Sequence, residues 1–116
     1  PVDAHSGATK RAQDGLALSS RNQYLSENER ALAPLLWQTL QHSAEILAAG
    51  PANDARPILI AARKTLEQAG FSVDYLDLRA ISTLSAAHDA TQDCALFAAA
   101  RLGQTRLIDN IQILDT

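Results

Sequence analysis

The sequence has one cysteine, few aromatic residues and a small net charge, and each of these limits what the protein can be. Cys94 is the single cysteine of 116 residues, which rules out an internal disulfide and a cysteine-based zinc site. Aromatic residues make up 4%, so leucine, isoleucine and alanine must fill the interior. A formal net charge of −3, with few aromatic side chains for stacking, argues against a nucleic-acid partner.

Long apolar runs and the common site fingerprints are also missing. No run approaches the ~20 residues that cross a bilayer, and the first residues lack the order of a signal peptide. We therefore expect a soluble, cytoplasmic protein without a membrane partner. The motifs GxGxxG, GxxxxGK[ST] and HExxH do not occur, and the three histidines lie scattered, so we predict no metal site on this chain.

The length suits one compact domain, which we place at residues 10–116. Residues 1–9, "PVDAHSGAT", are small and polar without an apolar period. We expect them to form a flexible arm or to be a remnant of expression.

Two helices are predicted in the first half of the domain. Ser26 and Glu29 have the spacing of a capping box, and apolar residues then recur every three or four positions from Leu32 to Leu47. Pro34 falls inside this pattern and predicts a bend or two helices in tandem. Residues 55–69 form the second helical pattern, with Gly70 as its stop.

The second half predicts strands. Residues 72–81 alternate between apolar and polar positions. Residues 94–102 are nearly all apolar and predict a central strand, with a short helix as the alternative. Gly103-Gln104 predicts a type II′ turn into a partner strand over 105–114. We expect an α+β fold, with two main helices packed on one face of a three-stranded antiparallel sheet.

Three polar features are candidate sites. Ser19, Ser20, Arg21 and Asn22 precede the first helix, where hydroxyls and a guanidinium either bind phosphate or simply cap a turn. Residue types alone favour the cap. Cys94 is predicted to be a buried thiol. The Asp109-Asn110 pair lies mid-strand, where structural hydrogen bonding is the favoured interpretation over a turn or a site.

Two longer motifs resemble a known family. "DGLALSSRNQYLS" at residues 14–26 and "AARLGQTRLIDNI" near the other end are similar to the C-terminal domain of the pantothenate synthetase (pantoate–β-alanine ligase) family. The resemblance runs from Lys10 or Arg11 to Asp115. It implies an enzyme that joins pantoate to β-alanine through a pantoyl adenylate, using ATP and Mg²⁺.

The resemblance also implies roles for particular residues. Ser19, Ser20 and Arg21 match the residues that contact the ATP phosphates, with Arg21 as the catalytic one. Arg11 matches an arginine upstream, for which a phosphate contact is also implied, and Asn22 is expected to shape the loop.

The family's architecture implies further expectations for the chain as a whole. The domain acts as a lid on an N-terminal nucleotide-binding Rossmann-type domain, which this chain lacks, in a full-length homodimer. The chain alone is expected to be inactive. The alternative is a non-catalytic interaction or oligomerisation module that has kept the fold.

Overall fold

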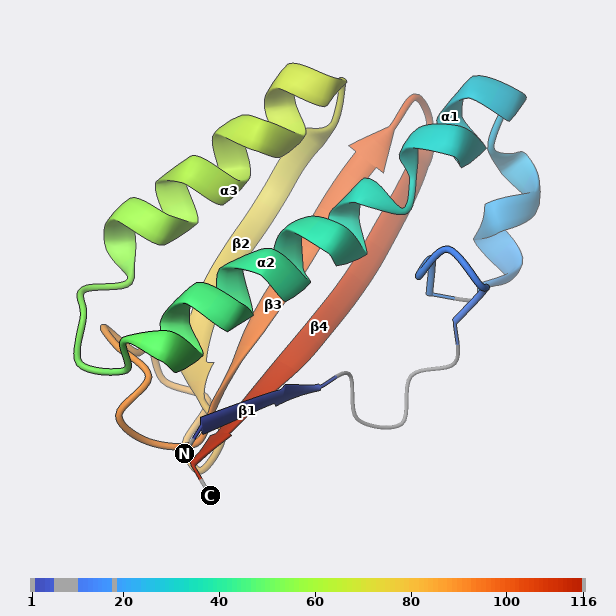
Figure 1. Cartoon of the computed structure of the whole chain (residues 1–116). Coiled ribbons are helices and arrows are strands. Elements are labelled where there is room, and N and C mark those ends of the chain that lie inside the picture. Colours follow the sequence, from blue (N-terminus) through green and yellow to red (C-terminus); the bar gives the residue numbers. More distant parts are fainter. Residues whose placement is uncertain (1, 6–10, 18, 116) are drawn as a thin grey trace.

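A computed structural model describes residues 2–5, 11–17 and 19–115, with the backbone alone at residues 2–5, 20, 21 and 115. The helices and strands follow in the order β1 (Val2–His5), η1 (Ser20–Tyr24), α1 (Glu27–Leu32), α2 (Leu35–Ala49), α3 (Arg56–Ala69), β2 (Ser72–Ala80), β3 (Cys94–Leu102) and β4 (Thr105–Asp115). The strands pair antiparallel in the order β1-β4-β3-β2. Helices α2 and α3 lie side by side across one face of this sheet (Figure 1).

The predicted fold class is confirmed, and the sheet gains one strand. Strands β2, β3 and β4 are the three that we expected, including the apolar stretch for which a helix was the alternative. Val2–His5 differs from the expected flexible arm, because it pairs with Gln112–Asp115 at the edge of the sheet. An edge strand carries unpaired backbone groups, so a short segment can join it without a strong side-chain pattern. Residues 1 and 6–9 of the expected arm lie outside the described residues.

The first helical segment is divided at Pro34, as its position predicts. Ser26 Oγ accepts a hydrogen bond from Glu29 N at 3.1 Å, and Glu29 Oε1 accepts one from Ser26 N at 2.9 Å, which confirms the capping box. Helix α1 then ends at Leu32, and α2 begins after Pro34, which lacks the N–H that a continuous helix needs. Leu32 was expected on the buried stripe but is 40% exposed, because this break takes α1 away from the core.

A β-bulge keeps the apolar side chains of β2 on one face. The pairing register with β3 shifts between Val73 and Tyr75, which adds one residue to β2. Because of this extra residue, Val73 and Leu76 both face the core although they are an odd number of positions apart. The alternation that predicted this strand therefore holds only beyond the bulge.

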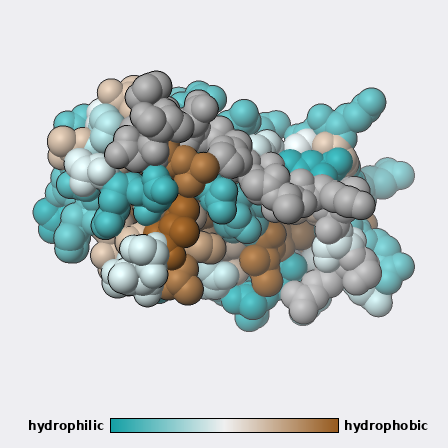
Figure 2. Space-filling model, turned by 90° about the horizontal axis from the view of Figure 1, so that it is seen from below, coloured by the Kyte–Doolittle hydropathy of each residue, from teal (hydrophilic) through white to brown (hydrophobic). Residues whose placement is uncertain are grey.

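The core lies between the sheet and the two helices. It is formed largely by leucine and alanine from α2, α3 and the three long strands, as the low aromatic content requires. Asp109 on β4 is an exception, because it is 5% exposed and lies between the buried residues Leu107 and Ile111. Seen from below, the apolar surface forms separate areas bordered by hydrophilic residues (Figure 2). Within the described part of the chain, no helix combines the length and apolar character needed to cross a bilayer.

The turn between β3 and β4 has the predicted type. Leu102 pairs with Thr105, which leaves Gly103 and Gln104 as a two-residue connection. Gly103 has φ +59°. Gln104 does not have a positive φ, because Leu84 is the one non-glycine position of the described chain that does. Positive φ at the first turn position alone is the type II′ pattern, which accounts for glycine there.

Candidate functional site

Arg11, three residues before the first motif of the family resemblance, forms an ion pair with Asp109 of the second motif. Arg11 Nη1 lies 2.6 Å from Asp109 Oδ2, and Arg11 Nη2 lies 2.7 Å from Asp109 Oδ1, although the residues are 98 positions apart. The side chains are 11% and 3% exposed. A planar guanidinium that meets both carboxylate oxygens is the strongest geometry for such a pair. The expected structural role of Asp109 is confirmed by these hydrogen bonds.

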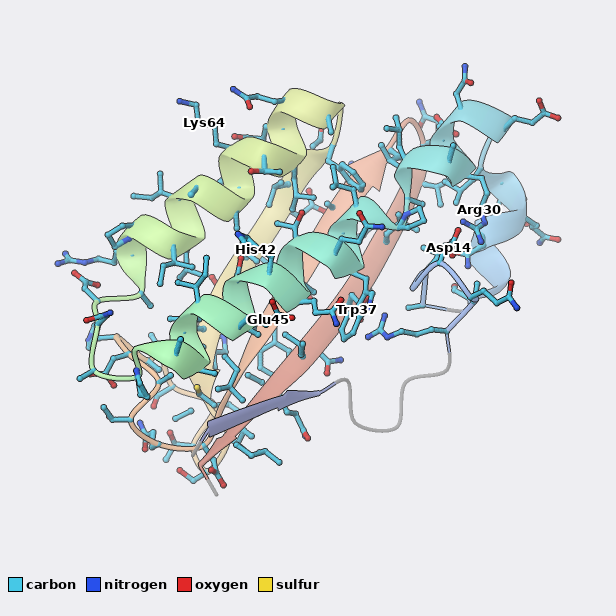
Figure 3. All side chains as sticks on the ribbon, viewed as in Figure 1. Asp14, Arg30, Trp37, His42, Glu45 and Lys64 are labelled. Atoms are coloured by element: carbon cyan, nitrogen blue, oxygen red, sulfur yellow. The ribbon has the colours of Figure 1, made fainter. Side chains whose placement is uncertain are left out.

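Trp37 of α2 forms the floor under this pair. The guanidinium carbon of Arg11 lies 3.5 Å from the centre of the Trp37 ring, which is a close cation–π contact. Trp37 projects from the side of α2 that faces the loop carrying Asp14 (Figure 3). The indole also packs against Gly15, where an added Cβ would collide with Trp37 Cδ1. Arg11, Trp37, Asp109 and Gly15 are called the clasp below.

The clasp holds the start of the loop that carries the serines. Arg11 Nη1 donates to Gly15 O at 3.1 Å, and Ala12 N donates to Leu16 O at 2.9 Å. Leu16 is 3% exposed and belongs to the core. Asn22 Nδ2 donates to the carbonyl oxygen of Ala17 at 3.0 Å, which is the loop-shaping role expected for Asn22. The loop that carries Ser19, Ser20, Arg21 and Asn22, called the serine loop below, is therefore held by hydrogen bonds on both sides of residue 18.

A pocket of about 290 Å³ lies between this loop, α2 and the edge of β4. It is lined by Leu16, Ala17, Ser19, Asn22, Ala33, Leu36, Trp37, Arg106, Leu107, Ile108 and Asp109. Asn22 Oδ1 is buried and accepts no hydrogen bond from any described residue. A pocket of this size has room for water to reach that oxygen.

The predicted site residues are placed differently by the structure. Ser19 is exposed and lines the pocket. Ser20 and Arg21 begin η1, so their backbone adjoins Ser19, while their side chains lie outside the described atoms. The guanidinium nitrogens Nη1 and Nη2 of Arg11 bond to Asp109 and Gly15, and the phosphate contact implied for Arg11 stays a prediction. We therefore place Arg11 in the clasp and keep Ser19, Ser20 and Arg21 as the predicted phosphate contacts.

Sequence reasoning missed the clasp as a unit. Trp37 is the one tryptophan of the chain, and Asp109 is an acidic residue between apolar strand positions. Trp37 was visible as the single tryptophan. Asp109 was a visible signal, because a buried charge needs a partner. The partner itself was not visible, because Arg11 is almost the whole chain away in sequence.

We expect Gly15→Ala to destabilise the protein by more than an ordinary surface substitution. Gly15 has φ +96°, a conformation that costs a residue with a Cβ about 1–2 kcal/mol. The collision with Trp37 adds to this and displaces the ring from Arg11. Chemical denaturation followed by circular dichroism measures the loss.

Gly70→Ala is the matched control for that experiment. Gly70 has φ +113°, but an added Cβ there meets no described atom within 4 Å. Equal losses for Gly15→Ala and Gly70→Ala would show that contact with Trp37 has no energetic weight.

A second ion pair joins the loop to α1 and depends on pH. Arg30 lies 2.7 Å from Asp14 Oδ2, and the two side chains face each other (Figure 3). The hydrogen bond from Arg30 holds the pKa of Asp14 below its ordinary value of 3.8. A lowered pKa in the folded state means that the stabilisation is present above pH 3.8 and is lost as the pH falls through the folded-state value.

We therefore expect Asp14→Asn to lower Tm at neutral pH and to leave Tm unchanged at pH values well below 3.8. Thermal unfolding of both proteins across this pH range is the measurement. A difference in Tm that stays constant with pH would contradict the assignment of the stabilisation to the Asp14 charge.

The remaining candidates do not form a site. Cys94 is 0% exposed, which confirms the predicted buried thiol, and burial raises the pKa of this thiol to about 11. The described residues contain no cluster of three or more His, Cys, Asp or Glu side chains that would hold a metal. A larger pocket of about 450 Å³ lies between α2 and α3. The described residues that line it include no lysine or arginine, so it does not suit phosphate.

Comparisons with known proteins agree on one family. The family model described as "Pantoate-beta-alanine ligase" matches residues 1–112. The chain is 50% identical over 113 residues to a pantothenate synthetase from Chromobacterium violaceum, covering 97% of this chain and 39% of that protein. It is 43% identical over 113 residues to one from Pseudomonas savastanoi pv. phaseolicola, covering 97% of this chain and 40% of that one.

A solved structure gives the same result. The crystal structure of pantothenate synthetase from Thermus thermophilus superposes with a TM-score of 0.76 at 38% identity. The match covers 88% of this chain and 37% of that structure. The chain thus spans about two fifths of the length of the relatives that it matches.

Proposed function

The chain belongs to the pantoate–β-alanine ligase family, and from this membership we propose that it is the lid domain of such a ligase. The proposed enzyme uses ATP to activate pantoate as an adenylate, which the amine of β-alanine then attacks to give pantothenate. Its partners are an N-terminal nucleotide-binding domain and a second subunit of a homodimer. We propose the cytoplasm as the location, with which a chain that has one buried cysteine and no cysteine pair for an internal disulfide is compatible.

The proposed task of the serine loop is to hold the polyphosphate of ATP. When pantoate attacks the α-phosphate, negative charge develops on the departing pyrophosphate. Preorganised hydroxyl and guanidinium donors stabilise that charge more in the transition state than in bound ATP. Ser19, Ser20 and Arg21 supply these donors in the proposal, and Arg21 supplies the positive charge.

One observation supports this assignment more than any other. Arg11 bonds to Asp109 of the second motif and to Gly15 O of the first, and the serine loop lies beside a pocket at the edge of β4. A loop that only capped a helix would need no anchor so far away in sequence. Ser26, with Glu29, already caps α1 without the residues of the serine loop.

The described residues do not form a Mg²⁺ site of their own. The described residues offer no cluster of three metal-binding side chains. We therefore assign no Mg²⁺ ligand to this chain. Its proposed contribution is to bind phosphate oxygens and, by closing, to keep water away from the adenylate, which water would hydrolyse.

Pantoate-dependent ATP–pyrophosphate exchange tests the proposal. Residues 11–115 would replace the matching residues of the Chromobacterium violaceum enzyme, to which the chain is 50% identical. We expect exchange by this chimera, none by the 116-residue chain alone, and recovery when the chain is added to the remainder of that enzyme. Equal exchange by the remainder with and without the chain would favour the non-catalytic interaction module.

A further inference from the structure

We propose that Asp109 and Trp37 are positioning residues for the serine loop and that they act through Arg11. This inference rests on the proposed function only for its effect on catalysis, since the positioning itself is a property of this chain. It gives Arg11 a different task from the phosphate contact that the resemblance implied. The clasp sets the place of the loop, and the loop residues contact the ligand.

The position of Asp109 is costly unless it serves the pair. Its neighbours on the same face of β4 are Leu107 and Ile111, and its side chain is 3% exposed. Apolar residues of similar size at both ends of such a pair are often as stable or more stable. A fixed geometry for Arg11 therefore explains the pair better than stability does.

The guanidinium of Arg11 is held from three directions. Asp109 of β4 accepts from both terminal nitrogens, and Trp37 of α2 covers one face of the group. Gly15 O accepts from Nη1, and Asn110 O lies 3.4 Å from Nη2. One planar group thus ties the sheet, the long helix and the Asp14-Gly15 turn together. A lysine cannot make these contacts because its single ammonium lacks the fork and the flat face.

These contacts lead directly to the serine loop. Arg11 pairs with Ala17 in an isolated antiparallel bridge, and Asn22 donates to Ala17 O. Ser19 is two positions beyond Ala17, and Asn22 N donates to Ser19 O at 3.1 Å. A shift of Arg11 therefore moves Ala17, and through it the first turn of η1.

Arg11 has no accessible donor left for a phosphate in this arrangement. Nη1 and Nη2 each have two acceptors within the protein. The remaining donor, Nε, is buried and has no partner among the described residues. A direct contact with the polyphosphate would require Arg11 to leave Asp109, and the buried carboxylate would then lose its positive partner and keep the backbone N–H of Asn110, which donates to Oδ1 at 2.8 Å.

A double-mutant cycle in the chimeric ligase separates positioning from phosphate contact. The variants are Arg11→Lys, Asp109→Asn and the two together, with Asp77→Asn on the far face of the sheet as the control. We expect each single variant to lower kcat for exchange by about 10²-fold, with a smaller change in KM for ATP. The double variant should be no worse than the poorer single one, because both remove the same clasp.

A phosphate contact by Arg11 predicts a different pattern. Arg11→Lys would then mainly raise KM for ATP, Asp109→Asn would keep near-normal exchange, and the two effects would add. That pattern overturns the inference. Arg11→Leu/Asp109→Leu guards against loss of the fold, because it removes both charges together. We expect it to fold and to exchange as poorly as the single variants, and normal exchange by this variant also overturns the inference.

Amide hydrogen exchange in the 116-residue chain tests the positioning without any activity. Asp109→Asn should speed exchange at residues 16–25 by about tenfold and leave α3 unchanged, since local opening is governed by local contacts. Unchanged protection of residues 16–25 overturns the inference even if the chimera is active. Failure of the proposed function would be seen in a different experiment, in which the chimera without substitutions would show no ATP–pyrophosphate exchange.

Discussion

Replacement of Arg21 by alanine lowers pantoate-dependent ATP–pyrophosphate exchange in the chimeric ligase by about 10²–10³-fold, which is the usual cost of one preorganised donor at a developing anion. Arg21 is the residue of the serine loop that carries a permanent positive charge. Its loss removes stabilisation of the departing pyrophosphate that Ser19 and Ser20, as neutral donors, do not replace. The effect should fall on kcat more than on KM for ATP, because the charge develops in the transition state.

The control for this measurement is Arg101→Ala. Arg101 is exposed, lies at the end of β3 and has its closest ion-pair contact with Asp74 at 3.5 Å. The Arg101→Ala substitution removes the same charge and the same side-chain volume as Arg21→Ala but leaves the serine loop unchanged. Equal losses for Arg21→Ala and Arg101→Ala would mean that net charge, and not a local contact, accounts for the effect. Normal exchange by Arg21→Ala would remove Arg21 from the proposed site.

Replacement of Arg11 by alanine should cost about 3–5 kcal/mol of unfolding free energy, the range found when one partner of a buried ion pair is removed. The Asp109 side chain, which is 3% exposed in the intact pair, would then lose its positive partner and keep only the hydrogen bond from Asn110 N among those described. Asp109→Ala should cost less, because Arg11 is on a loop and its long side chain can turn toward water. Urea unfolding followed by circular dichroism compares the variants.

Two further variants sharpen this comparison. Arg11→Ala/Asp109→Leu should recover most of the loss, because no charge remains buried. Arg79→Ala breaks the exposed pair with Asp77 at 3.2 Å, where about 1 kcal/mol or less is expected. Similar costs for Arg11→Ala and Arg79→Ala would contradict the buried character of the Arg11–Asp109 pair.

The sequence predicted those parts of the fold that depend on local chemistry. Ser26 and Glu29 predicted the start of a helix, Gly70 predicted the end of a helix, and Gly103 predicted a tight hairpin. Each of these residues meets a backbone requirement that is set within a few residues of the chain. Pro34 divides the first helical segment for the same local reason.

The features that were missed depend on contacts between distant segments. Strand β1 exists through pairing with β4, and the exposure of Leu32 follows from the direction that α1 takes after the break. The β2 bulge shows only in the pairing with β3. For the site, residue types in the serine loop allowed a cap or a phosphate contact, and the family resemblance favoured the second. The clasp could be identified only from the structure, because the sequence around Arg11 does not indicate that Asp109 is its partner.

The distance in sequence between Arg11 and Asp109 also sets an order of events during folding. The pair closes a span of 98 positions, and closing so long a loop costs chain entropy that only later contacts return. Hairpins such as β3–β4 and the two main helices depend on nearer partners and form without it. On the ribosome, a growing chain that has not yet reached β4 would therefore carry the serine loop without its anchor, so the proposed phosphate contacts of this loop should form only after β4 has been synthesised.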